Sequence, residues 1–400
     1  MLIVTHEFPP YTFGGIGVFC SYLANALAAK GTEVTVVAGC PSSDITRARL
    51  ADLRATDNNL EAIRVPRMRL PPSHLWYQLM NLNTISKLVS NFDVIHGQDC
   101  ATFPIISYCK KKNVNPPWIV TLHNNPTSER YYTLKSLASL ECSLKDFATY
   151  VLGFPLWDIS IRGHSKFADM LVAVSRSLSE EISRCYRIET RKLTTVHTGV
   201  DIAHLDGIVR CISPRQSNSN KIKIFYGGRL YWRKGILQLL KSLAYLTSKL
   251  GFKNFQLQVF GRGPLEPKIR ELISDFNLSN NVKLRGFVQY QELIASMATS
   301  DIVCVPSFYE ACPVAMIEGM ALGKPVVAFD RPFSRELLGD IPMRMMATSV
   351  EDYARCLYSL CTSEDLRRKL GERLRTRALE NFDITIIADE YLKLYRNLMS

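Results

Sequence analysis

The sequence SFYEACPVAMIEGMALGKPVVAFD, residues 307–330, contains the parts of a strand–loop–helix–strand unit. Pro313 follows a short loop, and its fixed φ suits the first residue of a helix. The apolar residues after it continue to Gly323, and Pro325 lies just beyond, where a helix does not continue. A buried strand is predicted over residues 325–329. This succession of elements is typical of a parallel α/β sheet.

Short apolar runs alternate with longer amphipathic stretches on both sides of this segment, which predicts a doubly wound α/β fold. The pattern gives way to SPRQSNSN at residues 213–220, a composition typical of a linker. We therefore expect a Rossmann-like domain over residues 1–205, a linker over 206–221 and a second Rossmann-like domain over 222–382. Because such sheets bind ligands at the carboxyl ends of their strands, we expect a ligand cleft between the two halves.

The same alternation predicts the individual elements. Strands are expected over residues 2–8, 33–39, 93–96, 118–123, 170–175 and 193–196, and then over 222–227, 255–260, 282–284, 302–306 and 325–329. Helices are expected over residues 18–30, 235–250, 265–276, 313–322 and 350–400.

The chain of 400 residues has a formal net charge of +12, which favours anionic partners such as nucleotides, phosphates, anionic lipid or nucleic acid. Its 11 cysteines are scattered without a C-x-x-C pair, which argues against a disulfide framework and a structural zinc site. No segment has the roughly 20 apolar residues that a membrane span needs, and the amino terminus lacks the pattern of a signal peptide. We therefore expect a cytoplasmic protein.

Glu318 lies inside an otherwise apolar helix, where a carboxylate is costly to bury without a partner. Sugar hydroxyls would supply that partner, and so would an ion pair, a capped neighbour or a wet crevice. Glu310 lies in the loop before the helix, where a solvated carboxylate is common. The free amides at the amino terminus of the helix form an anion site, so we expect an anionic group to bind there.

Glu310 and Glu318 together form an E-x7-E pattern. The segment resembles the E-x7-E region of the retaining glycosyltransferases with the GT-B fold, family 4 in particular. The resemblance implies two Rossmann-like domains facing across a cleft, with a final helix over residues 383–400 that packs back on the first domain. It also implies transfer of a sugar from a UDP- or GDP-linked donor to a glycan or lipid-linked acceptor, with retention at the anomeric carbon.

Two cations of the second half belong to a further family element. YGGRLYWRKG, residues 226–235, resembles the GRL…KG element and includes Gly228, Arg229 and Lys234. Both cations follow the carboxyl end of a strand, where they would neutralise a diphosphate leaving group. A single surface Lys or Arg is also common without any such role.

Two glycine turns match the family in the same order. VFGRGP, residues 259–264, resembles the G-x-GP turn and includes Gly263. LRGFV, residues 284–288, resembles the G-x-V element beside the nucleotide base and includes Val288. Glycine at either place could also serve only the turn itself.

In the first half, GGIG at residues 14–17 resembles the glycine-rich loop that lines the cleft beside the donor phosphates. It lacks the G-x-G-x-x-G spacing of a dinucleotide fingerprint. His123 follows a strand, at a position that in the resembled family lies near the transferred sugar. His96 and His6 also lie at strand ends, where a histidine is more often a packing or hydrogen-bonding residue.

The chain departs from the family pattern at two places. Ala311-Cys312-Pro313 replaces the usual Gly-Phe-Gly, and Pro313 has no amide hydrogen to donate to a ligand. Gly319 replaces an alanine after the second glutamate. These changes leave the sugar preference open.

The resemblance assigns catalytic roles to His123, Arg229, Lys234 and Glu310. It assigns donor contacts to Gly14, Gly15, Gly17, Gly228, Arg229, Lys234, Gly263, Val288, Glu310, Val314 and Glu318, with Glu318 on the ribose hydroxyls. The sequence has no D-x-D motif and no cluster with metal-ligand spacing, so we expect neither a metal ion nor another cofactor.

Three alternatives remain at this point. A sugar-nucleotide epimerase has the same fold but not the E-x7-E match, and a non-catalytic relative would keep only the donor pocket. A nucleic-acid-binding protein fits the charge, but the chain has no concentrated basic element or recognised module, so nucleic acid is not an expected partner.

The segment RVPRMRLPPSHLWYQLMNLN, residues 64–83, places arginines ahead of apolar and aromatic residues. This composition predicts peripheral contact with an anionic membrane, at its inner face. A helix of the domain that docks on its own sheet is the alternative.

Overall fold

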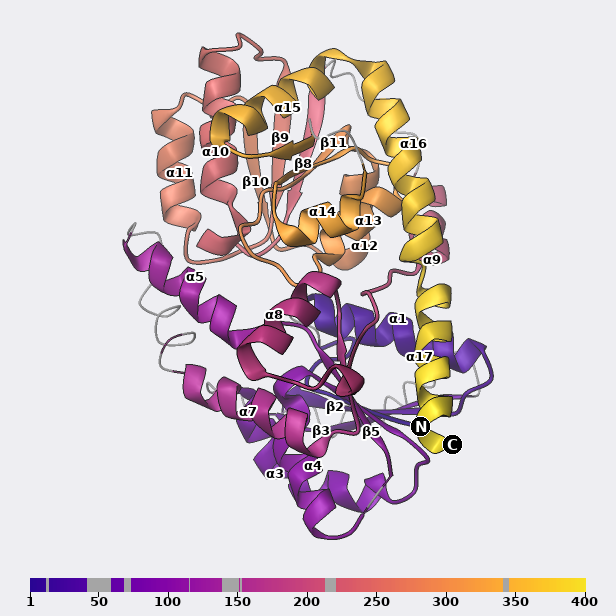
Figure 1. Cartoon of the computed structure of the whole chain (residues 1–400). Helices are drawn as coiled ribbons and strands as arrows, with labels where there is room; N and C mark the ends of the chain where they lie inside the picture. Colours follow the sequence, from indigo (N-terminus) through magenta and orange to yellow (C-terminus); the bar gives the residue numbers. More distant parts are fainter. Residues whose placement is uncertain are drawn as a thin grey trace. The chain divides into compact units, whose positions relative to one another are not determined.

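The computed structural model describes residues 1–11, 14–41, 59–67, 73–114, 116–138, 151, 153–212, 221–340 and 345–400. The chain divides into two compact units (Figure 1). The first comprises the described residues within Met1–Tyr131, Lys145–Gly199 and Ile384–Ser400, and the second comprises those within Tyr132–Leu144 and Val200–Asp383.

The first unit is built on a parallel sheet with the strand order β3-β2-β1-β4-β5-β6-β7. Its central strands β1, β4 and β5 are short and buried along their whole length, as expected for a parallel sheet covered on both faces, although β4 also contains His96 and Gln98. The strands span Leu2–Thr5 (β1), Val34–Pro41 (β2), Leu60–Arg67 (β3), Ile95–Gln98 (β4), Trp118–Leu122 (β5), Met170–Ala173 (β6) and Leu193–Thr195 (β7).

The helices of the first unit connect these strands and cover the sheet. They are α1 (Gly15–Ala29), α3 (Ser73–Val89), η2 (Asp99–Thr102), α4 (Phe103–Lys111), α5 (Pro126–Ala138, which begins in this unit), α7 (Phe154–Phe167), α8 (Arg176–Tyr186), η4 (Thr190–Lys192) and α17 (Ile384–Met399).

The second unit contains a parallel sheet with the strand order β10-β9-β8-β11-β12-β13. The strands span Ile222–Gly227 (β8), Phe255–Phe260 (β9), Val282–Gly286 (β10), Ile302–Val305 (β11), Val326–Phe329 (β12) and Met346–Ala347 (β13). The helices are α9 (Ile202–Arg210), η5 (Trp232–Lys234), α10 (Ile236–Ser248), α11 (Glu266–Asp275), α12 (Tyr290–Ala298), α13 (Val314–Ala321), α14 (Pro332–Leu338), α15 (Val350–Thr362) and α16 (Glu364–Asn381).

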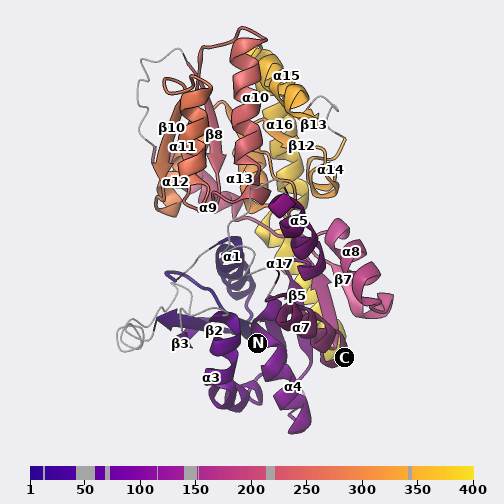
Figure 2. The same cartoon turned by 90° about the vertical axis from the view of Figure 1, so that its left-hand side faces the viewer.

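The chain winds outward from β8 in one direction and from β11 in the other. Because crossovers between parallel strands are right-handed, this reversal places α10 and α11 on one face and α13 on the other. Figure 2 shows α11, α10 and α15 side by side, and α13 packs instead against α9 and α16. The reversal between β8 and β11 is a topological switch point, where open α/β sheets bind their ligands.

The predicted α/β architecture of two Rossmann-like sheets is confirmed, and β8 and β9 have the predicted bounds. Most other elements are shorter than predicted by one to a few residues. The predicted helix over residues 350–400 is three helices, because Ser363 caps the start of α16 and Asp383 pairs with Val200 as an isolated bridge before α17.

The boundary between the units differs from the predicted one. Residue 205 falls inside α9, which belongs to the second unit, whereas the first unit ends at Gly199. The carboxylate of Asp201 accepts a hydrogen bond from the amide of His204 at 2.8 Å and so caps the start of this helix. The predicted linker over 206–221 therefore begins within a helix, and its residues 213–220 lie outside the described residues.

The predicted membrane-contact segment is largely internal where it is described. Arg64 and Arg67 lie on β3, are 7% and 3% exposed, and donate to the carbonyls of Phe8 and His6 at 3.1 Å. Tyr77 is fully buried, whereas Leu79 and Met80 are about half exposed. Arg64 and Arg67 therefore bind the loop after β1 and are not exposed to a membrane surface, which removes one reason for the predicted membrane contact. Arg69, Leu70 and the side chains of Leu75 and Trp76 lie outside the described parts.

The last helix, α17, belongs to the first unit and packs against α1. Tyr391 and Tyr395 are buried, and Asp389 forms an ion pair with Lys30 of α1 at 2.8 Å. In the parts of the chain that the structure describes, no helix is both long and apolar enough to span a membrane.

Candidate functional site

Two loops of the second unit meet at the switch point, one after β8 and one after β11. Gly235 has a φ of +69°, and a Cβ atom there would lie 1.8 Å from the carbonyl oxygen of Pro306. Only glycine allows this approach. The amide of Phe308 donates to the carbonyl of Arg233 at 2.8 Å, so the two loops are joined through their backbones.

This junction brings Lys234 and Glu310 together as an ion pair. The hydroxyl of Ser307 donates to the same carboxylate oxygen of Glu310 at 2.9 Å. Burial by itself would raise the pKa of Glu310, but the charges of Lys234 and Arg233 and the Ser307 hydrogen bond hold it below the ordinary value. The side chains of the pair are 25% and 12% exposed, so a ligand can reach them from one side.

Glu318 lies on α13 and is only 3% exposed. Its carboxylate accepts a hydrogen bond from the hydroxyl of Tyr290, the first residue of α12. Burial raises the pKa of Glu318 to about 7, although the Tyr290 hydrogen bond opposes the rise. A tyrosine hydroxyl thus partners the carboxylate that the sequence singled out, and the sequence analysis did not identify Tyr290.

The start of α13 differs slightly from the prediction. Pro313 is the N-cap and not the first helical residue, with φ −70° and ψ 107°, so Val314 provides the first amide of the helix. Gly319 allows α13 to pack closely on the sheet, because a Cβ atom there would lie 3.2 Å from Val303 and 3.3 Å from Val326. An alanine at position 319 would therefore require these valine side chains to shift by a few tenths of an ångström.

The loop after β9 lies against the loop after β8. A Cβ atom on Gly261, whose φ is +125°, would lie 1.9 Å from the carbonyl oxygen of Gly228. The amide of Leu230 donates to the carbonyl of Arg262 at 3.0 Å, and Gly263 follows directly. Arg229 is exposed beside this contact, with its side chain available to a ligand.

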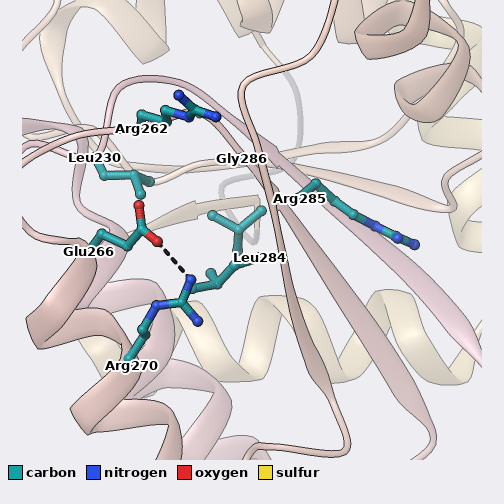
Figure 3. Close-up of a pocket in the computed structure, with 9 residues that line it drawn as sticks. Leu230, Arg262, Glu266, Arg270, Leu284, Arg285 and Gly286 are labelled. Carbon is teal, nitrogen blue, oxygen red and sulfur yellow. Dashed lines mark hydrogen bonds and ion pairs between the residues drawn. The ribbon is translucent and has the colours of Figure 1, made fainter.

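A cavity of about 270 Å³ lies at the carboxyl ends of β9 and β10, next to the first turns of α11 (Figure 3). Its lining residues come from the loop after β8, the two predicted glycine turns and α11: Leu230, Val259, Gly261, Arg262, Glu266, Arg270, Leu284, Arg285 and Gly286. Arg270 is paired with Glu266 at 2.7 Å. Val288 lies two residues beyond Gly286 and is half-buried. Lys234, Glu310 and Glu318 do not line this cavity.

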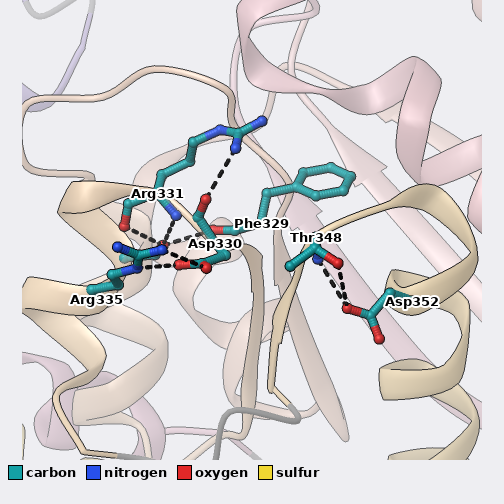
Figure 4. A network of polar contacts seen from close by, with 7 residues as sticks. Phe329, Asp330, Arg331, Arg335, Thr348 and Asp352 are labelled. Atoms are coloured by element: carbon teal, nitrogen blue, oxygen red, sulfur yellow. Dashed lines mark hydrogen bonds and ion pairs between the residues drawn. The ribbon is translucent and has the colours of Figure 1, made fainter.

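The side chain of Phe308, two positions before Glu310, packs against the end of β12. It stacks on Phe329 with ring centroids 5.7 Å apart, and the guanidinium of Arg331 lies 5.8 Å from its ring. Figure 4 shows Phe329 and Arg331 beside Asp330, which holds Arg335 through a forked ion pair. The two contacts of Phe308 restrict the loop that carries Glu310.

The glycine-rich loop of the first unit starts α1. Gly14 precedes the helix, and its amide donates to the carboxylate of Glu7 at 3.1 Å. Gly15 is the first residue of α1, and Gly17 is buried. Glu7 lies two residues after β1 and was not among the predicted site residues.

The two histidines of interest lie on neighbouring strands of the first unit. His123 follows β5, is half-buried, and shares a hydrogen bond of 2.8 Å with the side chain of Gln98. His96 is fully buried on β4 and bonds to Tyr395 and Thr121, so it is the hydrogen-bonding residue that the sequence indicated. Burial lowers the pKa of His96 to about 3, and partial burial lowers the pKa of His123 as well, so both side chains are neutral near pH 7.

The predicted site residues thus fall into two sets. Lys234, Glu310, Glu318, Val314, Gly228, Arg229, Gly263 and Val288 lie in the second unit, and Gly14, Gly15, Gly17 and His123 lie in the first. Among the described residues, no group of three or more His, Cys, Asp or Glu side chains could hold a metal ion.

Two family models match successive parts of the chain. Residues 13–204 match the model described as Glycosyltransferase Family 4, and residues 212–377 match the model described as Glycosyl transferases group 1. The MMP alpha-(1->4)-mannosyltransferase of Mycolicibacterium hassiacum is 24% identical over 97% of this chain and 95% of its own length.

Solved structures agree over the whole fold. Sucrose-phosphate synthase from Thermosynechococcus elongatus superposes with a TM-score of 0.73 at 19% identity, covering 99% of this chain and 98% of its own. Anabaena Alr3699/HepE in complex with UDP and glucose has a TM-score of 0.71 at 16% identity, covering 99% of each chain. With the two family models spanning both Rossmann-like units, the chain belongs to the family 4 (group 1) glycosyltransferases of the GT-B fold.

Proposed function

We propose that the protein transfers a sugar from a nucleoside diphosphate sugar with retention of the anomeric configuration. The observation that carries the proposal is the arrangement of two carboxylates around α13. Glu310 is ion-paired with Lys234 before the helix, and Glu318 is buried within it. A cation, a polar carboxyl and free helix amides are the groups that a diphosphate with its ribose requires.

In this proposal Lys234 and Arg229 neutralise the diphosphate as it leaves, together with the amides at the start of α13. Glu318 accepts hydrogen bonds from the ribose hydroxyls, and Glu310 lies nearer the transferred sugar. The acceptor oxygen attacks from the side of the leaving group, and a donor phosphate oxygen takes its proton. Catalysis then rests on positioning and charge neutralisation, without a metal ion or other cofactor.

Relatives with known ligands support a nucleotide donor. Anabaena Alr3699/HepE was solved with UDP and glucose, and the Mycolicibacterium relative is a mannosyltransferase. We therefore propose a UDP- or GDP-linked hexose as donor and a glycan or lipid-linked molecule as acceptor. The net charge of +12 suits such anionic ligands.

A panel of UDP- and GDP-sugars tests the proposal. We expect one diphosphate, UDP or GDP, to raise the melting temperature of the protein, and its matching sugar donor to be hydrolysed slowly without an acceptor. Stabilisation by nucleotide without turnover of any donor would instead indicate a non-catalytic relative. Conversion of the donor into its epimer would indicate an epimerase.

A further inference from the structure

A chain of polar side chains crosses the interior of the first unit, from the carboxy-terminal helix to His123. Tyr395 of α17 lies 2.8 Å from Nδ1 of His96. Nε2 of His96 lies 2.7 Å from the hydroxyl of Thr121 and 3.1 Å from the amide nitrogen of Gln98. The amide oxygen of Gln98 lies 2.8 Å from Nε2 of His123.

The donors and acceptors of this chain can be assigned from one group to the next. The amide nitrogen of Gln98 can only donate, so Nε2 of His96 must accept and carries no hydrogen. A neutral His96 then has its hydrogen on Nδ1, which donates to the hydroxyl of Tyr395. The amide oxygen of Gln98 can only accept, so Nε2 of His123 carries a hydrogen and donates it.

The other ring nitrogen of His123 is thereby left as an acceptor. None of the described residues forms a hydrogen bond with its Nδ1. A buried Nδ1 would then be a polar atom without a partner, and Nδ1 of His123 is not such an atom. Nδ1 of His123 therefore reaches solvent. A ligand hydroxyl beside His123 would find a ring nitrogen that accepts its hydrogen bond.

We propose that Gln98 is a positioning residue: it donates to His96, which Tyr395 holds in turn, and it fixes His123 as the tautomer that accepts through Nδ1. Gln98 can do this because its amide has a donor at one end and an acceptor at the other. The hydrogen positions on the two histidines are coupled as a result. The hydroxyl of Tyr395 on α17 accepts from Nδ1 of His96 and so stabilises this tautomer, and through Gln98 it stabilises that of His123.

Nitrogen NMR spectra of the full chain with labelled histidine test this directly, near neutral pH. We expect His96 with its hydrogen on Nδ1 and His123 with its hydrogen on Nε2. The seven histidines of the chain can be assigned through single His→Asn variants. The inverse pattern, or the same tautomer at both residues, would overturn the proposal.

Tyr395→Phe tests whether the hydrogen positions of His96 and His123 are coupled through the whole series of polar side chains. Without the Tyr395 hydroxyl, Nδ1–H of the buried His96 loses its acceptor, so the hydrogen moves to Nε2. The amide nitrogen of Gln98 would then face an N–H group, and the amide must turn over. We expect His123 to switch to the tautomer with hydrogen on Nδ1, although it is not bonded to Tyr395.

Tyr391→Phe is the matched control. It removes a hydroxyl from the same helix, but this hydroxyl bonds to Thr121 at 2.8 Å and not to a histidine. Thr121 can still donate to Nε2 of His96, so both tautomers should stay as in the unmodified protein. If the tautomer of His123 switches in both variants, or in neither, the proposed coupling between His96 and His123 is contradicted.

The consequence for sugar transfer rests on the proposed function. Gln98→Leu removes both amide contacts, and we expect a tenfold or larger fall in kcat while the Kd of UDP or GDP stays unchanged. Gln98→Glu keeps the acceptor for His123 and should recover part of kcat. The spectra need no substrate, so the two proposals can fail separately. If the unmodified protein shows the expected tautomers but transfers no sugar, only the proposed function is refuted. If its tautomers differ from the expected ones, only the role of Gln98 is refuted.

Discussion

Lys234 and Glu310 lie 76 residues apart in the sequence and form an ion pair, with Ser307 bonded to the same carboxylate oxygen. Both are residues that the sequence assigns to the donor, yet here each neutralises the other. A diphosphate that binds Lys234 must therefore compete with Glu310. Removal of one partner leaves the other charge half-buried and unpaired, which costs more than the loss of a surface ion pair.

Glu310→Gln should separate nucleotide binding from transfer. The substitution keeps the shape of the side chain and releases Lys234 to the diphosphate, so we expect UDP or GDP to bind as tightly as before or more tightly. The transfer rate should fall on the order of a hundredfold, because the carboxylate matters as charge develops on the sugar. Calorimetric titration and initial rates measure the two effects, and a weakened nucleotide Kd with an unchanged rate would contradict the assignment.

Lys234→Ala should weaken nucleotide binding, unlike Glu310→Gln. Loss of a charge-assisted contact of roughly 1.5–3 kcal/mol should weaken binding of the diphosphate about ten- to a hundredfold. Lys369→Ala is a control for the loss of one positive charge, because Lys369 is an exposed residue of α16 paired with Asp365. Equal effects of the two substitutions would mean that Lys234 acts only through the net charge.

The sequence predicted the second unit more accurately than the first, for physical reasons. The strand β8 is a short and mostly apolar run that ends at a pair of glycines, and its bounds were predicted correctly. The strand β3 was missed because Arg64, Pro66 and Arg67 interrupt its apolar pattern. It is an edge strand, where proline is tolerated. Its arginines are buried and donate hydrogen bonds to carbonyl groups of the loop after β1, which is distant in the sequence.

In the candidate site, too, local signals could be predicted from the sequence and contacts between distant elements could not. Glu318 could be singled out from one helix, since a carboxylate among apolar residues is a local signal. Its partner Tyr290 lies on another helix, and nothing in the local sequence shows that α12 places this hydroxyl on Glu318. Gln98 lies just beyond the strand predicted over residues 93–96, and its link to Tyr395 through His96 depends on where α17 packs, which only the tertiary structure shows.

Transfer should proceed without a divalent metal ion. Lys234 is paired with Glu310 in the loop before α13, Arg229 lies in the same loop as Lys234, and the described residues contain no group of three or more His, Cys, Asp or Glu side chains that could hold a metal. We expect the initial rate in EDTA to match the rate in Mg²⁺ or Mn²⁺. Complete loss of transfer in EDTA that either ion restores would contradict this prediction.

Deletion of Ile384–Ser400 should destabilise the first unit selectively. The deletion removes the buried side chains of Tyr391 and Tyr395 and the ion pair of Asp389 with Lys30. Since truncation of one buried aromatic side chain costs about 3–5 kcal/mol, the first unit should unfold at a much lower denaturant concentration. Hydrogen exchange in peptides of β1 and β5 should rise, while peptides of β8 and β9 stay protected.

A shorter deletion provides the control for this experiment. Removal of only Met399 and Ser400 takes away exposed residues at the end of α17, with half of the Met399 surface in solvent. Its exchange pattern should match that of the full chain. If the long deletion leaves β1 and β5 as protected as the short one, α17 does not stabilise the first unit.

Glu318 should make both stability and nucleotide binding depend on pH. Its pKa is raised from 4.5 to about 7 in the folded protein, so between these values the folded state holds a proton that the unfolded state has lost. The stabilisation is fully present below pH 4.5 and is lost as the pH rises through about 7. The shift of about 2.5 pKa units corresponds to at most about 3.5 kcal/mol, at roughly 1.4 kcal/mol per pKa unit.

Glu318→Gln imitates the protonated form at every pH, so it isolates this contribution. We expect the unfolding free energy of Glu318→Gln, relative to that of the parent protein, to rise as the pH increases from 4.5 towards 8. Nucleotide binding should show the inverse trend, because ribose hydroxyls donate to the ionised carboxylate. The affinity of the parent protein for UDP or GDP should therefore increase through about pH 7, and that of Glu318→Gln should stay flat and about ten- to a hundredfold weaker at high pH. If the nucleotide affinities of the two proteins change with pH in the same way, Glu318 does not bind the ribose.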